Sequence, residues 1–256
     1  MFYHNINPTL IHLGPLQIRY YGLIFVIGFI IAYYMIPYLA KKRNLELTKN
    51  DTADLIFYLI IGTIIGARLF YILFYNLPFY LSNPLSIFAV WQGGLSFHGG
   101  LVGSITAIYY FCKKKQFNIL GLLDIIVIPL SLALMLGRIG NFINAELVGT
   151  ITSVPWAVKF PGYEGFRHPS QLYESLKNLV IFITLWNIKG KHLKKGILFS
   201  TFIIMYSILR FAVGFVRAPD PQLGYIIFNL TMGQLLNIVM FAIGIFFIFR
   251  INKKEE

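Results

Sequence analysis

The sequence predicts an all-α integral membrane protein with about seven transmembrane helices. Three observations predict this fold: 57% of the 256 residues are hydrophobic and only 12% are charged, the hydrophobic residues form long runs, and most basic residues lie in the connections between runs. In a soluble domain about a quarter of the residues are charged, and the core of such a domain could not bury this much apolar surface. We expect one transmembrane domain over residues 1–256.

Seven apolar runs approach or exceed the length of about 20 residues that a membrane helix needs. The first, second and last are the longest, and the fifth is the shortest. The expected helices cover residues 17–39, 53–75, 95–111, 119–137, 174–188, 197–216 and 228–250. Outer connections at about 76–94 and 138–173 then form a small head region on the outer face. The chain shows no internal repeat, so it does not resemble a duplicated transporter.

The basic residues predict the orientation, because Lys and Arg in short connections stay in the cytoplasm. Four clusters occupy every second connection and the C-terminus: Lys41, Lys42, Arg43 and Lys49; Lys113 to Lys115; Lys189, Lys191, Lys194 and Lys195; Arg250, Lys253 and Lys254. This alternation fits seven spans with the N-terminus outside and the C-terminus in the cytoplasm. No Lys or Arg precedes Arg19, so the basic start of a cleavable signal peptide is missing. We expect the first helix to remain in the mature protein.

Composition also narrows the partners. The net charge of +12 is spread over short clusters and not over an amphipathic face, so we expect no nucleic acid. The single cysteine, Cys112, excludes an intramolecular disulfide, and the five histidines lack metal-ligand spacing. We expect no metal and no cofactor.

Three arginines stand in or at the edge of apolar runs: Arg68, Arg138 and Arg210. A charge inside a membrane segment predicts a functional site, and a guanidinium binds phosphate through two parallel hydrogen bonds. Snorkelling, in which a long side chain extends its charge to the lipid head groups, is our interpretation for three other basic residues: Arg19, Lys159 and Lys177.

Polar segments near the outer face supply the other candidates. His98 lies among five glycines in residues 93–103, which let a backbone or a lipid approach closely; a structural histidine in tight helix packing is the alternative. Arg138 and Asn141 are three residues apart and share a helix face, with Glu146 close behind. Tyr206 and Arg210 share a face of a later helix. Tyr20 and Tyr21 add outer hydroxyls, although an aromatic interface belt is a strong alternative explanation for both. Asp54 and Asp124 lie on the inner side and are left out of the site.

Four segments of the sequence resemble those of bacterial prolipoprotein diacylglyceryl transferases: GARLFY (residues 66–71), GGLSFHGGLVG (93–103), GRIGNFINAELVG (137–149) and RHPSQLYE (167–174). The similarity runs in order along nearly the whole chain. It implies a multi-pass enzyme of the bacterial inner membrane, with its active site toward the outer, periplasmic side. The implied reaction moves the diacylglyceryl group of phosphatidylglycerol onto the lipobox cysteine of a prolipoprotein signal peptide and releases glycerol phosphate, the first step of lipoprotein maturation.

The resemblance also implies site residues. Those matching positions that the family needs for activity or lipid binding are Tyr21, His98, Arg138, Asn141, Glu146, Gly149, Tyr206 and Arg210, with Arg68 in a further matched segment. Two positions depart from the family pattern. Ala145 replaces a glycine, and Gly214 replaces a glutamate that commonly follows the arginine matched to Arg210.

The expected mechanism assigns the phosphate clamp to Arg138 and Arg210, which take up charge as glycerol phosphate leaves. Asn141 positions the same group, Glu146 orients an arginine, and His98 either accepts the thiol proton or binds the head group. The glycines around His98 admit acyl chains from the bilayer. The sulfur comes from the substrate, because Cys112 lies at the cytoplasmic end. An anion channel or carrier and another phospholipid-using transferase are the alternatives.

Overall fold

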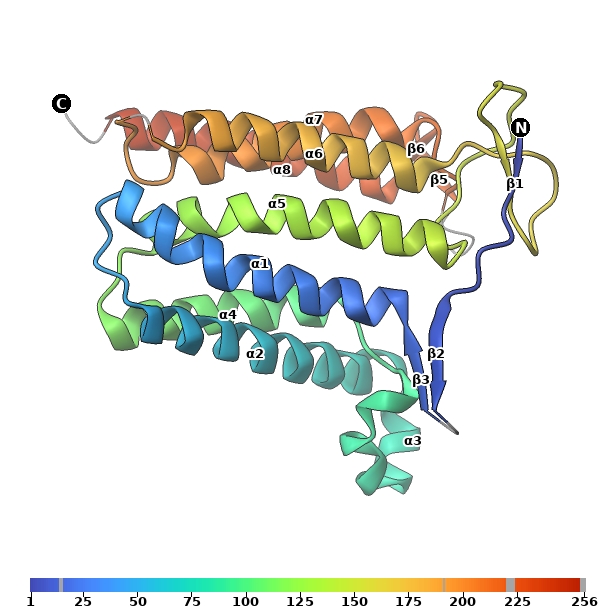
Figure 1. The fold of residues 1–256 in the computed structure, drawn as a ribbon, viewed down its shortest axis with the longest axis horizontal. Helices are drawn as coiled ribbons and strands as arrows, with labels where there is room; N and C mark the ends of the chain where they lie inside the picture. The colour runs from blue at the N-terminus through green and yellow to red at the C-terminus, as the bar shows by residue number, and fades with distance from the viewer. Residues whose placement is uncertain (14–15, 191, 220–223, 254–256) are drawn as a thin grey trace. The chain divides into compact units, whose positions relative to one another are not determined.

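The computed structural model describes residues 1–13, 16–190, 192–219 and 224–253. The chain divides into two compact units, residues 1–43 with 123–256 and residues 44–122. Helices dominate both units (Figure 1). All candidate site residues from Arg138 to Arg210 belong to the first unit.

The first unit is built from long helices. They are α1 (Tyr20–Lys42), α5 (Ile119–Ile143, of which residues from 123 onward belong here), α6 (Ser170–Ile188), α7 (Ile197–Gly214) and α8 (Met232–Lys253). Helix α7 packs against both α6 and α8, and the three run together in Figure 1. Helix α1 lies close to α5 because Gly28 faces Ala133.

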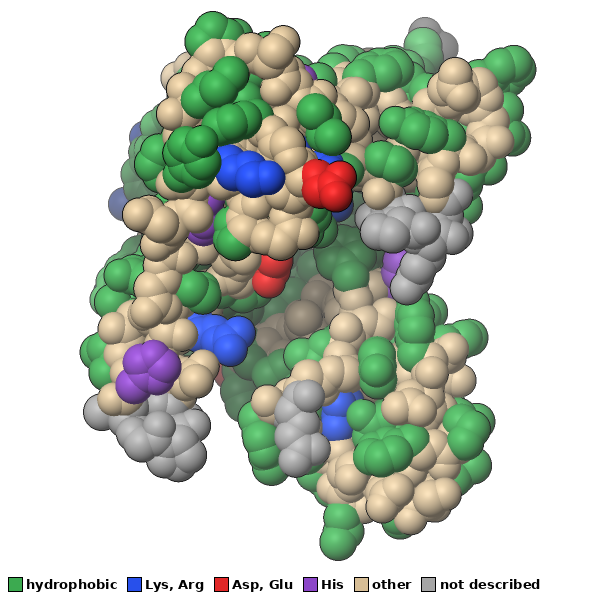
Figure 2. Space-filling model, turned by 90° about the vertical axis from the view of Figure 1, so that its right-hand side faces the viewer, with side chains coloured by type: hydrophobic (Ala, Val, Ile, Leu, Met, Phe, Trp, Pro, Cys, Tyr) green, Lys and Arg blue, Asp and Glu red, His purple; other side chains and the backbone are tan. Residues whose placement is uncertain are grey.

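Short strands lie at the end of this unit where α1 begins (Figure 1). The pairs are β1 (Phe2–Tyr3) with β4 (Val158–Lys159), β2 (Thr9–Leu13) with β3 (Leu16–Arg19), and β5 (Tyr225–Ile227) with β6 (Leu230–Thr231). These three strand pairs show that the all-α expectation was wrong. Segments outside the helices must still pair their backbone N–H and C=O groups, and here they do so in short strands. A small core of Val148, Val158 and Phe160, packed against Phe142 and Ala145, supports this region. Viewed from that side, hydrophobic and uncharged side chains prevail over a few charged ones (Figure 2).

Asp124 holds the opposite end of the first unit together. Its carboxylate is fully buried, lies 2.9 Å from Nη2 of Arg43, and accepts backbone N–H bonds from Gly196 and Phe199 at 2.8 and 2.9 Å. A carboxylate at the start of a helix satisfies backbone donors that the helix itself cannot pair. Asp124 therefore joins the end of α1 and the beginning of α7 to α5.

The second unit contains α2 (Lys49–Tyr75), α3 (Leu77–Ser82), the 3₁₀ helices η1 (Pro84–Phe88) and η2 (Val90–Gln92), and α4 (Phe97–Lys115). Helices α2 and α4 pack along a glycine face. A Cβ at Gly62 would stand 2.8 Å from the carbonyl oxygen of Gly103, and a Cβ at Gly66 would stand 2.8 Å from Cα of Gly103. Gly99 and Gly103, close to His98, therefore serve the approach of two helices, and the admission of acyl chains past these glycines stays a prediction.

Among the described residues, five helices are long and apolar enough to cross a membrane: α1, α2, α5, α7 and α8. The chain is therefore a multi-pass membrane protein. Helices α4 and α6, with 19 residues each, occupy the positions of the third and fifth expected spans. Helix α5 continues to Ile143, so residues 138–143 are helical and not part of a connection. The single domain over 1–256 and the outer connection at about 76–94 stay predictions. The other predicted connection, 138–173, is shortened at both ends, by α5 up to Ile143 and by α6 from Ser170.

Candidate functional site

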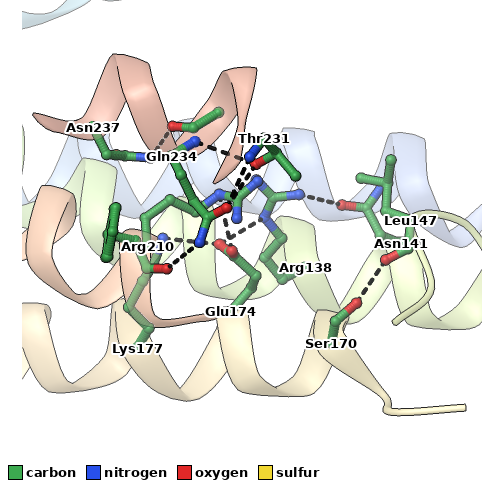
Figure 3. A network of polar contacts seen from close by, with 12 residues as sticks. Arg138, Asn141, Leu147, Ser170, Glu174, Lys177, Arg210, Thr231, Gln234 and Asn237 are labelled. Carbon is green, nitrogen blue, oxygen red and sulfur yellow. Dashed lines mark hydrogen bonds and ion pairs between the residues drawn. The ribbon is translucent and has the colours of Figure 1, made fainter. Parts of the chain in front are cut away.

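A buried carboxylate organises the polar residues of the first unit (Figure 3). The side chain of Glu174, on the first turns of α6, is 1% exposed. Its Oε1 lies 3.1 Å from Nε of Arg210, and its Oε2 lies 2.8 Å from Nζ of Lys177 and 3.7 Å from Nε of Arg138. Helices α5, α6 and α7 thus bring three cations to one anion. We call these four residues the Glu174 cluster.

Lys177 does not snorkel, and that interpretation of the sequence was wrong. The residue is 4% exposed, and its ammonium lies 3.7 Å from the ring centroid of Tyr206. Because Glu174 and Lys177 are three residues apart on one helix face, they pair directly. A buried ammonium is stable only with such partners, and here a carboxylate and an aromatic face supply them.

Asn141 connects Arg138 to Glu146. Arg138 Nη1 lies 3.4 Å from Oδ1 of Asn141, whose Nδ2 donates to Glu146 Oε2 at 3.2 Å. Asn144 also donates to this carboxylate, at 3.2 Å. Glu146 therefore orients Asn141, while Glu174 orients the arginines. The expectation had assigned that second role to Glu146.

The turn after α5 places Glu146. The backbone of Ala145 and of Leu147 adopts positive φ angles of 55° and 56°, and the carbonyl of Glu146 accepts a hydrogen bond from Gln171 Nε2 at 2.5 Å. A β-branched residue would resist this left-handed conformation, whereas Ala145 tolerates it. The departure from the family's glycine at 145 is thus accommodated.

Gly149 fixes the crossing of three segments. A Cβ there would stand 2.6 Å from the carbonyl oxygens of His168 and Val216, and its own N–H donates to His168 O at 3.0 Å. Arg167 Nη1 donates to the Gly149 carbonyl at 3.1 Å. Gly149 therefore allows a close backbone approach, which holds the loop after α5 against the start of α6.

Gln234 occupies the space beside Gly214. A Cβ at residue 214 would stand 2.6 Å from Cγ of Gln234, whose Oε1 accepts from the backbone N–H of Thr231 at 2.9 Å. Gln234 is 1% exposed. The space beside residue 214, where the resemblance implies a glutamate, is thus filled by the amide side chain of Gln234 on α8. Glu174 is the carboxylate that pairs with Arg210.

The chain is similar to a known protein family over nearly its whole length. A sequence profile described as prolipoprotein diacylglyceryl transferase matches residues 8–250. The chain belongs to the prolipoprotein diacylglyceryl transferase family.

Several curated relatives are named phosphatidylglycerol–prolipoprotein diacylglyceryl transferase. One from Geobacter sulfurreducens is 49% identical over 96% of this chain and 95% of its own. One from Solidesulfovibrio magneticus is 43% identical, covering 98% and 97% of the two chains. One from Coxiella burnetii is 41% identical, covering 100% and 99%. The similarity to other diacylglyceryl transferases therefore extends over the full length.

Two candidate site residues of this diacylglyceryl transferase, Arg68 and His98, lie in the second unit. Arg68 is 5% exposed and donates to five backbone carbonyls, those of Ser86, Ile87, Ala89, Gly93 and Gly94. A guanidinium has five N–H donors, so its capacity is used within the chain. Arg68 therefore anchors the 3₁₀ segment between α3 and α4, and its lipid contact stays a prediction.

His98 and Tyr21 present rings near the ends of their helices. His98 is exposed at the second position of α4, with ring centroids 5.8 Å from Phe97 and 6.5 Å from Phe70. Tyr21 is the second residue of α1, and a Cβ on Gly140 of α5 would stand 2.8 Å from its ring. The exposed imidazole is accessible, as a base or a head-group ligand must be.

The sequence interpretation missed Glu174 and Lys177 as site residues. A signal was present, because an acid and a base three residues apart inside an apolar run suggest a buried ion pair. With three cations and one carboxylate, the Glu174 cluster keeps a surplus of positive charge that can bind an anion such as phosphate. Within the described residues, no three His, Cys, Asp or Glu side chains gather as metal ligands would.

Proposed function

We propose that this chain transfers the diacylglyceryl group of phosphatidylglycerol to the thiol of a lipobox cysteine in a prolipoprotein signal peptide. A carbon–sulfur bond forms at the glycerol carbon, the bond from that carbon to the phosphate oxygen breaks, and the oxygen keeps the electron pair as glycerol phosphate leaves. The observation that carries the proposal is the positive Glu174 cluster among apolar helices. Family membership supports the same reaction.

Arg138 and Arg210 bind the phosphate and stabilise the negative charge that it gains. Both are mostly buried, with side chains 20% and 15% exposed, so their charges act in a medium of low dielectric constant. Glu174 fixes both guanidinium groups, which lowers the reorganisation that the reaction requires. Asn141, held by Glu146, donates an amide hydrogen to the same phosphate. Tyr21, Tyr206, Gly149 and Arg68 shape the surroundings.

His98 stays in one of two proposed roles, as the base for the thiol proton or as a ligand of the lipid head group. A base must reach the thiol, and the ring is exposed at the N-terminal end of α4. A positive field near the sulfur would also favour the thiolate.

The proposed topology has seven spans, with α4 and α6 added to the five most apolar helices. Basic residues in the last turns of α1, α4 and α8 support a cytoplasmic C-terminus. The Glu174 cluster then lies toward the periplasmic half of the bacterial inner membrane, where a signal peptide cysteine would meet it.

The test uses purified protein in detergent with phosphatidylglycerol and a lipobox peptide that contains one cysteine. Mass spectrometry of the peptide should show a diacylglyceryl adduct with wild-type protein, no adduct when serine replaces the cysteine, and strong loss with Arg138→Ala. A folded wild-type protein that forms no adduct would overturn the transferase proposal. An adduct on the serine peptide would indicate a different acceptor.

A further inference from the structure

The net positive charge of the Glu174 cluster exceeds the single negative charge of a phosphodiester. Three cations, on Arg138, Lys177 and Arg210, surround one carboxylate, so two positive charges remain. The phosphate of phosphatidylglycerol carries one negative charge. A phosphate monoester carries close to two at neutral pH.

Lys177 creates this surplus without reaching a ligand. Its side chain is 2% exposed, with its ammonium against Glu174 Oε2 and the Tyr206 ring. At 2.8 Å it is closer to Oε2 than Arg138 is, at 3.7 Å. Lys177 therefore takes the stronger interaction with that oxygen, and the charge of Arg138 stays less neutralised.

We propose that Lys177 is a positioning residue that matches the Glu174 cluster to a phosphate dianion and not to a monoanion. The inference rests on the proposed function. In that reaction a thiolate and a phosphodiester, with one negative charge each, become a neutral thioether and a dianionic glycerol phosphate. The second charge reaches the phosphate only as the carbon–oxygen bond breaks, so a site that prefers the dianion stabilises the transition state more than the bound lipid.

The direct test compares the binding of two soluble probes at pH 8, glycerol 1-phosphate as the dianion and glycerophosphoglycerol as the monoanion. Isothermal titration calorimetry gives both Kd values without turnover. We expect wild-type protein to prefer the dianion, and Lys177→Met to reduce that preference on the order of tenfold, because one buried charge is lost. Lys177→Arg should keep the preference within about threefold.

Two further variants separate charge from structure. Lys177→Gln removes the charge but keeps an N–H donor for Glu174, so it should lose the preference as Lys177→Met does, even if the methionine variant folds poorly. Lys189→Met is the matched control, since the ammonium of Lys189 also lies over an aromatic ring, that of Trp186 at 3.6 Å, but at the far end of α6. It should bind both probes as wild-type protein does.

Kinetics supply a second readout. Removal of Lys177 should lower kcat about tenfold and change KM for phosphatidylglycerol little, because the lost stabilisation concerns charge that develops during the reaction. If wild-type protein forms the adduct but Lys177→Gln binds the two probes in the wild-type ratio, this inference is wrong and the proposed function stands. If wild-type protein forms no adduct, the proposed function fails regardless of the binding data.

Discussion

Glu174 on α6 holds Arg210 on α7, with Oε1 of the carboxylate 3.1 Å from Nε of the guanidinium. The other oxygen serves Lys177 and Arg138. An arginine that meets a carboxylate through Nε has its terminal nitrogens available for a second anion. The ion pair therefore leaves the terminal nitrogens of Arg210 able to bind a second anion, as the proposed phosphate clamp requires.

Glu174→Gln should reduce the rate of adduct formation about 100-fold, because the arginines lose the anion that fixes their position. The substitution also removes the charged partner of Lys177, so the thermal midpoint should fall as well. Adduct formation per folded molecule, followed by peptide mass, measures the catalytic effect. Glu164→Gln, at an exposed position, is the control and should stay within twofold of wild type, about the error of such an assay.

Helix positions were predictable from the sequence because apolar runs are long and interrupted by basic clusters. The second run ends at Tyr75 as predicted, and the last shifts by only a few residues. Helix α6 begins at Ser170 and not near 174, because its first turn is polar. Those polar residues bond the loop after α5, through Ser170 to Leu147 O at 2.8 Å, which hydropathy alone does not reveal.

Arg138 and Arg210 could be singled out from the sequence, but their partners could not. Arg138 and Arg210 stand out as charges beside apolar runs, whereas the pairing of Glu174 with both depends on how α5, α6 and α7 pack. Arg68 gave the same sequence signal and yet bonds five carbonyls of its own unit. A charged residue in an apolar run thus indicates a buried polar partner without identifying it.

Gly214→Ala should destabilise the protein by about 1–3 kcal/mol, because its Cβ would overlap Gln234. The double variant Gly214→Ala/Gln234→Ala removes the overlapping atoms and should recover part of the loss. Thermal unfolding in detergent measures both. Gly22→Ala is the control, since a Cβ there meets nothing within 4 Å, and it should not lower the midpoint. Equal midpoints for Gly214→Ala and wild type would contradict the packing of Gln234.

Arg68→Lys should destabilise the 3₁₀ segment by about 2–5 kcal/mol, because an ammonium has three donors and cannot reach five carbonyls in a fixed fork. Limited proteolysis should then cut between residues 84 and 94 faster than in wild type. The conservative control is Arg19→Lys, whose exposed guanidinium bonds only Gln17 among the described residues, at 3.3 Å. Unchanged proteolysis in Arg68→Lys would assign Arg68 a role outside this segment.

His168 should make stability depend on pH. Tyr173 accepts a hydrogen bond from Trp156 Nε1 at 2.7 Å, and its hydroxyl oxygen lies 3.1 Å from Nδ1 of His168. We expect the hydroxyl hydrogen of Tyr173 to point to that nitrogen. Burial lowers the pKa of His168 below its ordinary value of 6.5. The neutral ring therefore contributes stability that is complete above pH 6.5 and is lost as the pH falls through the lower pKa of the folded protein.

The measurement is the difference in thermal midpoint between wild type and His168→Gln from pH 8 to pH 5. We expect the advantage of wild type to be constant at the upper end and to shrink below pH 6.5, the ordinary pKa. Tyr173→Phe removes the donor to Nδ1 and should weaken this dependence, whereas Tyr163→Phe, on an exposed loop residue, should leave it unchanged. A wild-type advantage that grows toward acidic pH would show that His168 is held as a cation, and the hydrogen-bond direction from Tyr173 would then be reversed.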